Sequence, residues 1–302
     1  MAFPSWMKDA LRVAQRKKIG TQPGIGEDTD TQEYQIPASP FPGMTLAGVL
    51  FEGLTDITFG AAEAPIADTT MIDLSVGDVD VRQTSDNKGS RIQSPGNAQR
   101  LSEYLRLVEA QQDVPPTAQG AGPDAGHWNL FVPFCGIGQC TVKMRTGLIA
   151  NVYAADVTAI AVSFTVYAVY VPTSAIAENY RMVVRETNIP AMTEGNVSTY
   201  LNALENCALH GLLFNISALS TAGADRLTRI GYSDGVVAFD DNAQTVYADN
   251  DAQLGDPVDL PRTAGCFYYP LLGRPYKRDG SVFINPEYSA ATAMNVLCVQ
   301  SL

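Results

Sequence analysis

The sequence of 302 residues predicts an all-β protein built from two tandem β-sandwiches. Runs of β-branched and aromatic residues recur along the chain between Gly, Pro and Asp turns, and no helix alternates with them as a parallel sheet would require. Only 17% of the residues are charged, below the usual ~25%, which is typical of a protein whose surface is largely covered by neighbours. The length and the 46% apolar content suffice for one large or two medium cores.

The first twenty residues differ in charge from the rest of the chain. The stretch from Ser5 to Gly20 carries five basic residues and one acid, a charge of +5 − 1 = +4, whereas the whole chain has a charge of −12. On a helix its apolar residues gather on one side and its basic residues on the other. Ser5 is a suitable N-cap and Gly20 a suitable stop. This pattern predicts a basic amphipathic helix of about 14 residues.

Such a helix is marginal alone in water, so we expect a surface to order it. A lipid surface, a nucleic acid, a neighbouring subunit and the protein's own domain are the alternatives, and a basic face opposite Trp and Leu favours an anionic membrane. The predicted membrane-facing residues are Trp6, Met7, Lys8, Leu11, Arg12, Val13, Arg16, Lys17 and Lys18. No apolar stretch of the usual ~7–15 residues follows the charges as in a signal peptide, so we expect synthesis in a cytoplasm.

A linker rich in Gly, Pro and Thr, from Gly20 to Gly43, precedes five strand candidates in the first half. These are residues 44–60, 70–83, 127–134, 140–155 and 157–171. The last has fifteen uncharged residues, eight of them β-branched. As a helix it would reach only ~22 Å, short of the ~30 Å hydrocarbon core of a membrane. We therefore predict a long strand with both faces largely covered.

Pro172 ends this strand and marks the predicted boundary between the sandwiches. The predicted domains are an arm and linker at 1–30, a first sandwich at 31–173 and a second at 174–302. Strand candidates in the second half are 180–189, 226–240, 245–249, 265–273, 281–288 and 295–302, with a hairpin turn at Ser233-Asp234-Gly235. Helical spacing of apolar residues also predicts two inserted helices, at 97–111 and at 196–214.

Candidate catalytic groups are few, because the sequence contains five cysteines and two histidines. The closest cysteines, Cys135 and Cys140, lack the second pair that a zinc site needs, so we expect buried free thiols. We expect His127, at a strand start, to be a half-buried structural residue. His210 follows Cys207 at a spacing that two metal ligands could share, without another Cys or His partner nearby. No dinucleotide or phosphate-loop motif is present, and we predict that the protein is not an enzyme.

Acidic residues are densest between Asp240 and Asp259. Their spacing is not that of an EF-hand loop, and a solvated loop is the favoured interpretation, although oxygen ligands this close could hold calcium between subunits. The calcium candidates are Asp249, Asp251 and Asp256, and we predict no other cofactor. The acid excess of the body argues against nucleic-acid binding, and no direct sequence-specific nucleic-acid partner is expected.

Four features together resemble a known family. They are the basic N-terminal arm, the opening strands at 43–60 and 70–83, the helix before 127–134, and the long strand that ends at Tyr170-Val171-Pro172 before a second sandwich. In this order they resemble the double jelly-roll major capsid proteins of tailless, icosahedral, membrane-containing bacteriophages and their viral relatives. The resemblance implies two tandem jelly rolls.

The same resemblance implies a function in the virion. The chain would form trimeric, pseudo-hexameric capsomers of an icosahedral shell, with its arm facing an internal lipid membrane and with minor capsid and vertex proteins as further partners. Two other classes stay open, namely a phage spike or carbohydrate-binding β-sandwich and, with less support, a β-sandwich hydrolase that uses a carboxylate pair. The scarcity of histidine weighs against the hydrolase.

Overall fold

A computed structural model of the chain describes residues 5–60, 78–83, 122–133, 135, 139–146, 157–177, 182–192, 197–216, 227–236, 238–242, 266–277, 280–286 and 292–301. Among these residues the regular elements are strands except for helix α1 (Ser5–Leu11) and the short 3-10 helix η2 (Thr173–Ala175). The chain divides into two compact units, Met1–Met182 and Val183–Leu302. The division falls 182 − 173 = 9 residues after the boundary predicted from the sequence.

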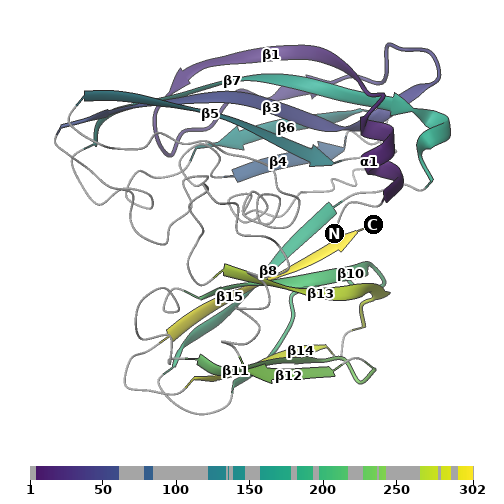
Figure 1. The fold of residues 1–302 in the computed structure, drawn as a ribbon, viewed down its shortest axis with the longest axis vertical. Coiled ribbons are helices and arrows are strands. Elements are labelled where there is room, and N and C mark those ends of the chain that lie inside the picture. The colour runs from purple at the N-terminus through teal and green to yellow at the C-terminus, as the bar shows by residue number, and fades with distance from the viewer. Residues whose placement is uncertain are drawn as a thin grey trace. The chain divides into compact units, whose positions relative to one another are not determined.

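The first unit contains two antiparallel sheets (Figure 1). The first sheet has the order β1-β7-β3-β5, made of β1 (Gln15–Ile25), β7 (Val157–Pro172), β3 (Met44–Phe59) and β5 (Gly122–Pro133). The second has the order β2-β6-β4, made of β2 (Tyr34–Ile36), β6 (Cys140–Arg145) and β4 (Asp78–Gln83). Neighbouring strands are far apart in sequence, as in Greek-key sandwiches.

The long strands β3 and β7 form the centre of the first sheet. Along β7, Val162, Phe164 and Val166 are buried, and the residues between them are half-buried on the opposite face. The centroid of the Phe164 ring lies 5.6 Å from that of Phe51 on β3 and 6.1 Å from that of Trp128 on β5. The prediction of a long strand with both faces largely covered is therefore confirmed.

Gly53 on β3 leaves room for the indole of Trp128. A β-carbon at this position would lie 2.2 Å from two atoms of the indole, so any other residue would displace the ring. The indole is also held by a hydrogen bond of 3.1 Å, which Trp128 Nε1 donates to Oγ1 of the buried Thr55. The position thus requires glycine because of close packing.

The chain passes from the first sheet to the second through residues 26–31. The Thr146 hydroxyl donates to the Gly26 carbonyl oxygen at 2.7 Å, and the Thr146 amide donates to the Thr29 carbonyl oxygen at 3.1 Å. Beyond this crossing, the Tyr34 ring lies over Gly20 and its hydroxyl donates to the buried Gln22 side chain at 3.2 Å. These contacts join β1 of one sheet to β2 of the other.

The second unit is likewise a pair of antiparallel sheets, and here each sheet has four strands. One has the order β13-β10-β15-β8, made of β13 (Cys266–Pro275), β10 (Ala208–Ile216), β15 (Thr292–Ser301) and β8 (Met182–Met192). The other has the order β12-β11-β14-β9, made of β12 (Ala238–Asn242), β11 (Leu227–Ser233), β14 (Ser281–Pro286) and β9 (Val197–Tyr200). Alternate apolar residues of both sheets form one core.

The predicted strands of the second half correspond to described strands except for 245–249, which lies outside the described residues. The predicted hairpin turn is confirmed, because Ser233 pairs with Ala238 and Gly235 has a φ of +80°. The helix predicted at 196–214 is wrong. That segment consists of β9, an irregular stretch and most of β10, because pairing with β14, β13 and β15 outweighs the local helical pattern. The helix predicted at 97–111 lies outside the described residues.

Candidate functional site at the N-terminal arm

The N-terminal arm begins with a helix much shorter than the sequence predicts. Helix α1 covers seven residues, and its last turn closes with bonds from the amides of Arg12, Val13 and Ala14 to carbonyl oxygens three residues earlier, at 3.2–3.3 Å. Met7 and Ala10 are buried, at 0% and 2% exposure, where the helix contacts β7 and η2. The helix is therefore docked on its own unit.

From Gln15 the arm is a strand, which corrects the helix predicted to continue to Gly20. Gln15 pairs with Tyr170, and the register continues along β7 with shifts after Lys18 and after Gln22. The physical reason is that the edge of β7 offers backbone hydrogen bonds along the whole segment, whereas a short isolated helix in water is marginal. Residues 15–25 are thus part of the first sheet rather than a free amphipathic helix.

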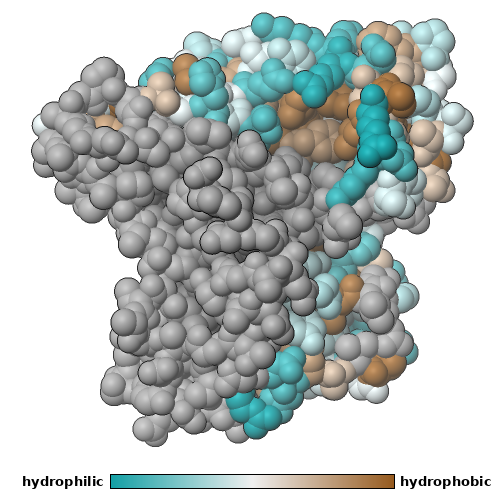
Figure 2. All heavy atoms as spheres, viewed as in Figure 1, coloured by the Kyte–Doolittle hydropathy of each residue, from teal (hydrophilic) through white to brown (hydrophobic). Residues whose placement is uncertain are grey.

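The structure distributes the predicted membrane-facing residues over three environments. Met7 is buried inside the unit, which does not fit a lipid-facing role in this conformation, and Trp6, Lys8 and Leu11 are half-buried. Exposed residues are grouped around the turn between α1 and β1 and on the first strand residues: Arg12, Val13, Arg16, Lys17 and Lys18. In Figure 2 the coloured atoms along β1 are mostly hydrophilic, whereas hydrophilic and hydrophobic atoms lie side by side around α1.

Two of the exposed arginines form ion pairs. Arg16 Nη1 lies 3.0 Å from Glu52 Oε1 on β3, so its side chain reaches across β7, and Arg12 Nη1 lies 3.4 Å from Asp9 within the arm. Both pairs are exposed and contribute little to stability. Lys17 and Lys18 therefore carry most of the positive charge that the arm presents to a partner. Sequence reasoning missed the Arg16–Glu52 pair, because no local spacing relates residues of β1 and β3.

Trp6 has one unusual atom. Among the described residues, its indole Nε1 is a buried side-chain donor without a hydrogen-bond partner. Such donors are rare in folded proteins, and each lost hydrogen bond costs about 1–3 kcal/mol. The arm is thus the place in the described chain where a polar partner would satisfy an unpaired buried group.

Among the described residues, the structure does not gather the predicted metal-binding residues into a site. Asp249, Asp251 and Asp256 lie outside the described residues, and the described part of the chain contains no group of three or more acidic, Cys or His residues that could hold a metal. Of the neighbouring acids, Asp240 pairs with Arg229, and Asp241 accepts a hydrogen bond of 3.3 Å from the Tyr269 hydroxyl. The calcium site therefore stays a prediction.

The structure also shows where both histidines and four of the cysteines lie. His127 is exposed on β5, so its expected half-buried position is wrong, and His210 Nε2 lies 2.7 Å from the Ser301 hydroxyl. Cys135, Cys140, Cys207 and Cys298 are buried free thiols, as expected. Burial raises the pKa of Cys135 and of Cys140 to about 12, which keeps both as weakly nucleophilic thiols at neutral pH.

Across the described helices, none combines the length and the apolar character that a membrane-spanning helix needs.

No protein-family model matches the sequence, and no curated protein matches it. Solved structures do match the fold. The STIV MCP, from Sulfolobus turreted icosahedral virus, has a TM-score of 0.61 at 12% identity, over 95% of this chain and 96% of that one. The major capsid protein P2 of bacteriophage PM2 has a TM-score of 0.51 at 11% identity over 96% and 98%, and the Faustovirus major capsid protein 0.52 at 9% over 96% and 90%. The chain thus has the fold of these capsid proteins, and the predicted all-β fold with two sandwiches and an N-terminal helix is confirmed.

Proposed function

We propose that the chain is a major capsid protein, a structural subunit of a viral shell rather than an enzyme. The observation that carries this proposal is the likeness of fold over almost the full length of both chains, with 95% of this chain matched to 96% of the STIV MCP. The likeness extends over both sandwiches rather than one, which supports a capsid role for the whole chain. The site of action is then the virion, and synthesis takes place in the host cytoplasm.

The assembly unit in this proposal is a homotrimer with a pseudo-hexameric outline, six sandwiches in all, which packs into an icosahedral shell. The low fraction of charged residues, 17%, supports extensive contact between subunits. Obligate interfaces of this kind bury more than ~2,000 Å² in total. Minor capsid and vertex proteins are the further partners. For the acidic stretch the solvated loop stays the favoured interpretation, and a calcium ion held by Asp249, Asp251 and Asp256 between subunits is the alternative that a chelator tests.

The arm faces an internal, anionic membrane in this proposal. Val13 is an exposed apolar residue of the arm, with an exposed fraction of 56%. The exposed Arg12 precedes it in the turn, and the exposed Lys17 and Lys18 follow on β1. Basic side chains near an anionic lipid surface contribute about 1 kcal/mol each. One arm would bind weakly, whereas many arms on one shell would bind firmly through their high effective concentration.

Assembly is tested on the purified protein and on particles. Mass measurement of the purified chain should give a trimer, and electron microscopy of the native particle should show a regular shell with trimeric capsomers. A monomer that persists at high concentration and forms no regular assembly contradicts the proposal. Addition of a chelator tests the calcium ion, because removal of an ion bound only to the folded state lowers the melting temperature.

The membrane contact needs substitutions rather than deletion, since deleting residues 1–20 would also remove part of β1 from the sheet. Lys17→Gln with Lys18→Gln removes two exposed charges and should weaken binding to anionic vesicles about thirtyfold per subunit, from about 1 kcal/mol for each lysine. The control, Lys143→Gln with Lys277→Gln, removes the same charge elsewhere. Equal binding by both variants contradicts the membrane assignment, as does a loss of DNA binding alone.

A further inference from the structure

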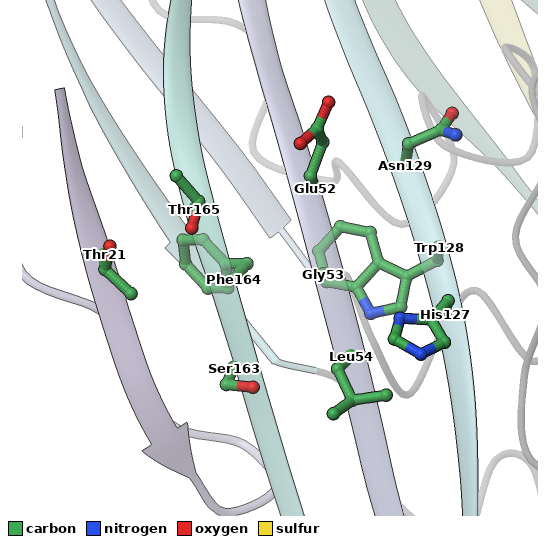
Figure 3. A pocket seen from close by; sticks show the side chains of 10 residues that line it. All are labelled: Thr21, Glu52, Gly53, Leu54, His127, Trp128, Asn129, Ser163, Phe164 and Thr165. Atoms are coloured by element: carbon green, nitrogen blue, oxygen red, sulfur yellow. The ribbon is translucent and has the colours of Figure 1, made fainter. Parts of the chain in front are cut away.

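The outward face of the first sheet carries a hollow (Figure 3). It has a volume of about 560 Å³ and lies across all four strands, β1, β7, β3 and β5. Volumes of about 300–1,000 Å³ are those of small-molecule sites in proteins. Four strands at a spacing of ~4.8 Å give a trough roughly 14 Å long.

The floor of the trough is backbone. Gly53 pairs with Trp128 on one side and with Phe164 on the other, so these residues form one row across the sheet. The side chains of Trp128 and Phe164 point inward, and both residues are almost fully buried. Because the indole over Gly53 is fixed by its hydrogen bond to Thr55, the floor is rigid.

The walls are two rows of outward side chains, one on each side of this floor. In the first row Thr165 lies opposite Glu52, and Glu52 lies opposite Asn129. In the second row Ser163 lies opposite Leu54, and Leu54 lies opposite His127. Directly paired residues of antiparallel strands share a face of the sheet, so all six side chains stand on the same side.

The polar groups of these walls are hydroxyl, amide and imidazole, with one carboxylate. Hydroxyl and amide groups both donate and accept hydrogen bonds, and Leu54 is the one aliphatic side chain among the six. Glu52 is the one carboxylate among them, and it is balanced by Arg16 at 3.0 Å. The hollow offers polar and apolar surface in about equal amounts, which suits a ligand that carries hydroxyl groups around an apolar ring face. An ionic ligand would meet a local charge that is already balanced.

From this arrangement we infer that the trough binds a neutral, hydroxyl-rich ligand, a short saccharide, lying across the strands. The rigid floor means that little reorganisation accompanies binding, which favours affinity. His127 and Asn129 are exposed on the edge strand β5, so a ligand can enter from that side. The inference is independent of the shell assembly proposed above, because the site is contained in one subunit.

The test is ligand-observed NMR of the purified full chain with neutral trisaccharides: maltotriose, cellotriose and mannotriose. Binding in the ~1 mM range is expected for at least one of them. Asn129→Ala should weaken it about tenfold, and Thr165→Val, which keeps the side-chain shape and removes the hydroxyl, should weaken it severalfold. Gln35→Ala is the matched control, because it removes an exposed amide from β2 in the other sheet.

A second part of the experiment distinguishes the two sources of such a ligand, a free sugar and a glycan on a cell surface. The bound trisaccharide is presented free in solution and coupled to a lipid in vesicles, and tighter binding to the vesicles assigns the site to a cell-surface glycan. Absence of binding by all three sugars overturns the inference. A loss of affinity in Gln35→Ala equal to the loss in Asn129→Ala also overturns it. A trough variant that changes only self-association, measured by sedimentation, also overturns it, since the occupant is then a second copy of the chain.

Discussion

Replacement of Gly53 by alanine should destabilise the first unit strongly although it adds only one methyl group. The new β-carbon would lie 2.2 Å from the indole of Trp128, so the ring must move. Overpacking of this kind costs about 1–3 kcal/mol. Movement of the ring also breaks the 3.1 Å hydrogen bond to the buried Thr55, which adds about 1–3 kcal/mol. The expected loss in the free energy of unfolding is about 2–6 kcal/mol.

Urea unfolding followed by tryptophan fluorescence measures this loss. The two tryptophans of the chain, Trp6 and Trp128, both lie in the first unit, so the signal follows that unit and leaves the second aside. The control is Gly26→Ala, where the nearest atom to an added β-carbon is 4.0 Å away. This control should be neutral or slightly stabilising, by up to about 1 kcal/mol. If Gly53→Ala changes the unfolding free energy by no more than the control does, the packing argument is refuted.

Three further predictions concern other parts of the chain. Met7→Ala should loosen α1 and speed tryptic cleavage after Arg12 severalfold, whereas the exposed Val13→Ala should not; equal rates would mean that burial of Met7 does not hold the helix. Because burial raises the pKa of Cys135 and of Cys140 from 9.0 to about 12, the unfolded state loses protons that the folded state keeps, and stability should fall between pH 9 and pH 12. The slope is about 1.4 kcal/mol per pH unit for each thiol, and Cys135→Ala with Cys140→Ala should flatten the pH dependence of the urea midpoint. Gly235→Ala should cost about 1–2 kcal/mol, since its φ is +80°, and an unchanged melting temperature of the second unit would contradict that strain.

The sequence predicted β3 and β7 well because the strand pattern of each covers many consecutive residues and depends on those residues alone. β7 is an uninterrupted uncharged run rich in β-branched and aromatic residues and is too short to be a membrane span. In β3 the apolar residues outweigh the few Gly, Glu and Asp residues that interrupt them. The turn at Asp234-Gly235 was predictable for a similar reason, because the turn requires a positive φ and glycine adopts a positive φ readily.

The arm and the segment 196–214 were not predictable in the same way. In both, helical spacing of apolar residues competes with strand pairing, and the partners, β7 for the arm and β14, β13 and β15 for the other, lie far away in the sequence. Tyr200 and Leu201 illustrate the outcome, because Tyr200 is 74% exposed at the end of β9 and the adjacent Leu201 is buried, whereas a helix would place both on its apolar side. Tertiary pairing decided these elements.

Nor could spacing alone predict the trough. Its walls come from Ser163 and Thr165 on β7, Glu52 and Leu54 on β3, and His127 and Asn129 on β5, which meet only through the register of the sheet. Asn129 and Thr165 have no motif around them that would mark them as a site. The signal that could have identified them is the alternation along each strand, once the strand order is known.

The position of β7 between β1 and β3 also sets the order in which the subunit can be completed during synthesis. Gln15 must wait for Tyr170, 170 − 15 = 155 residues later, before its pairing can form. At 5–20 residues per second the ribosome needs roughly 10–30 s to make that stretch. Until then β1 and β3 have a missing strand between them, so the first sandwich closes by insertion of its last-made strand into the middle of a sheet. Until β7 has been made, a nascent chain therefore has no finished first sandwich to offer to other copies.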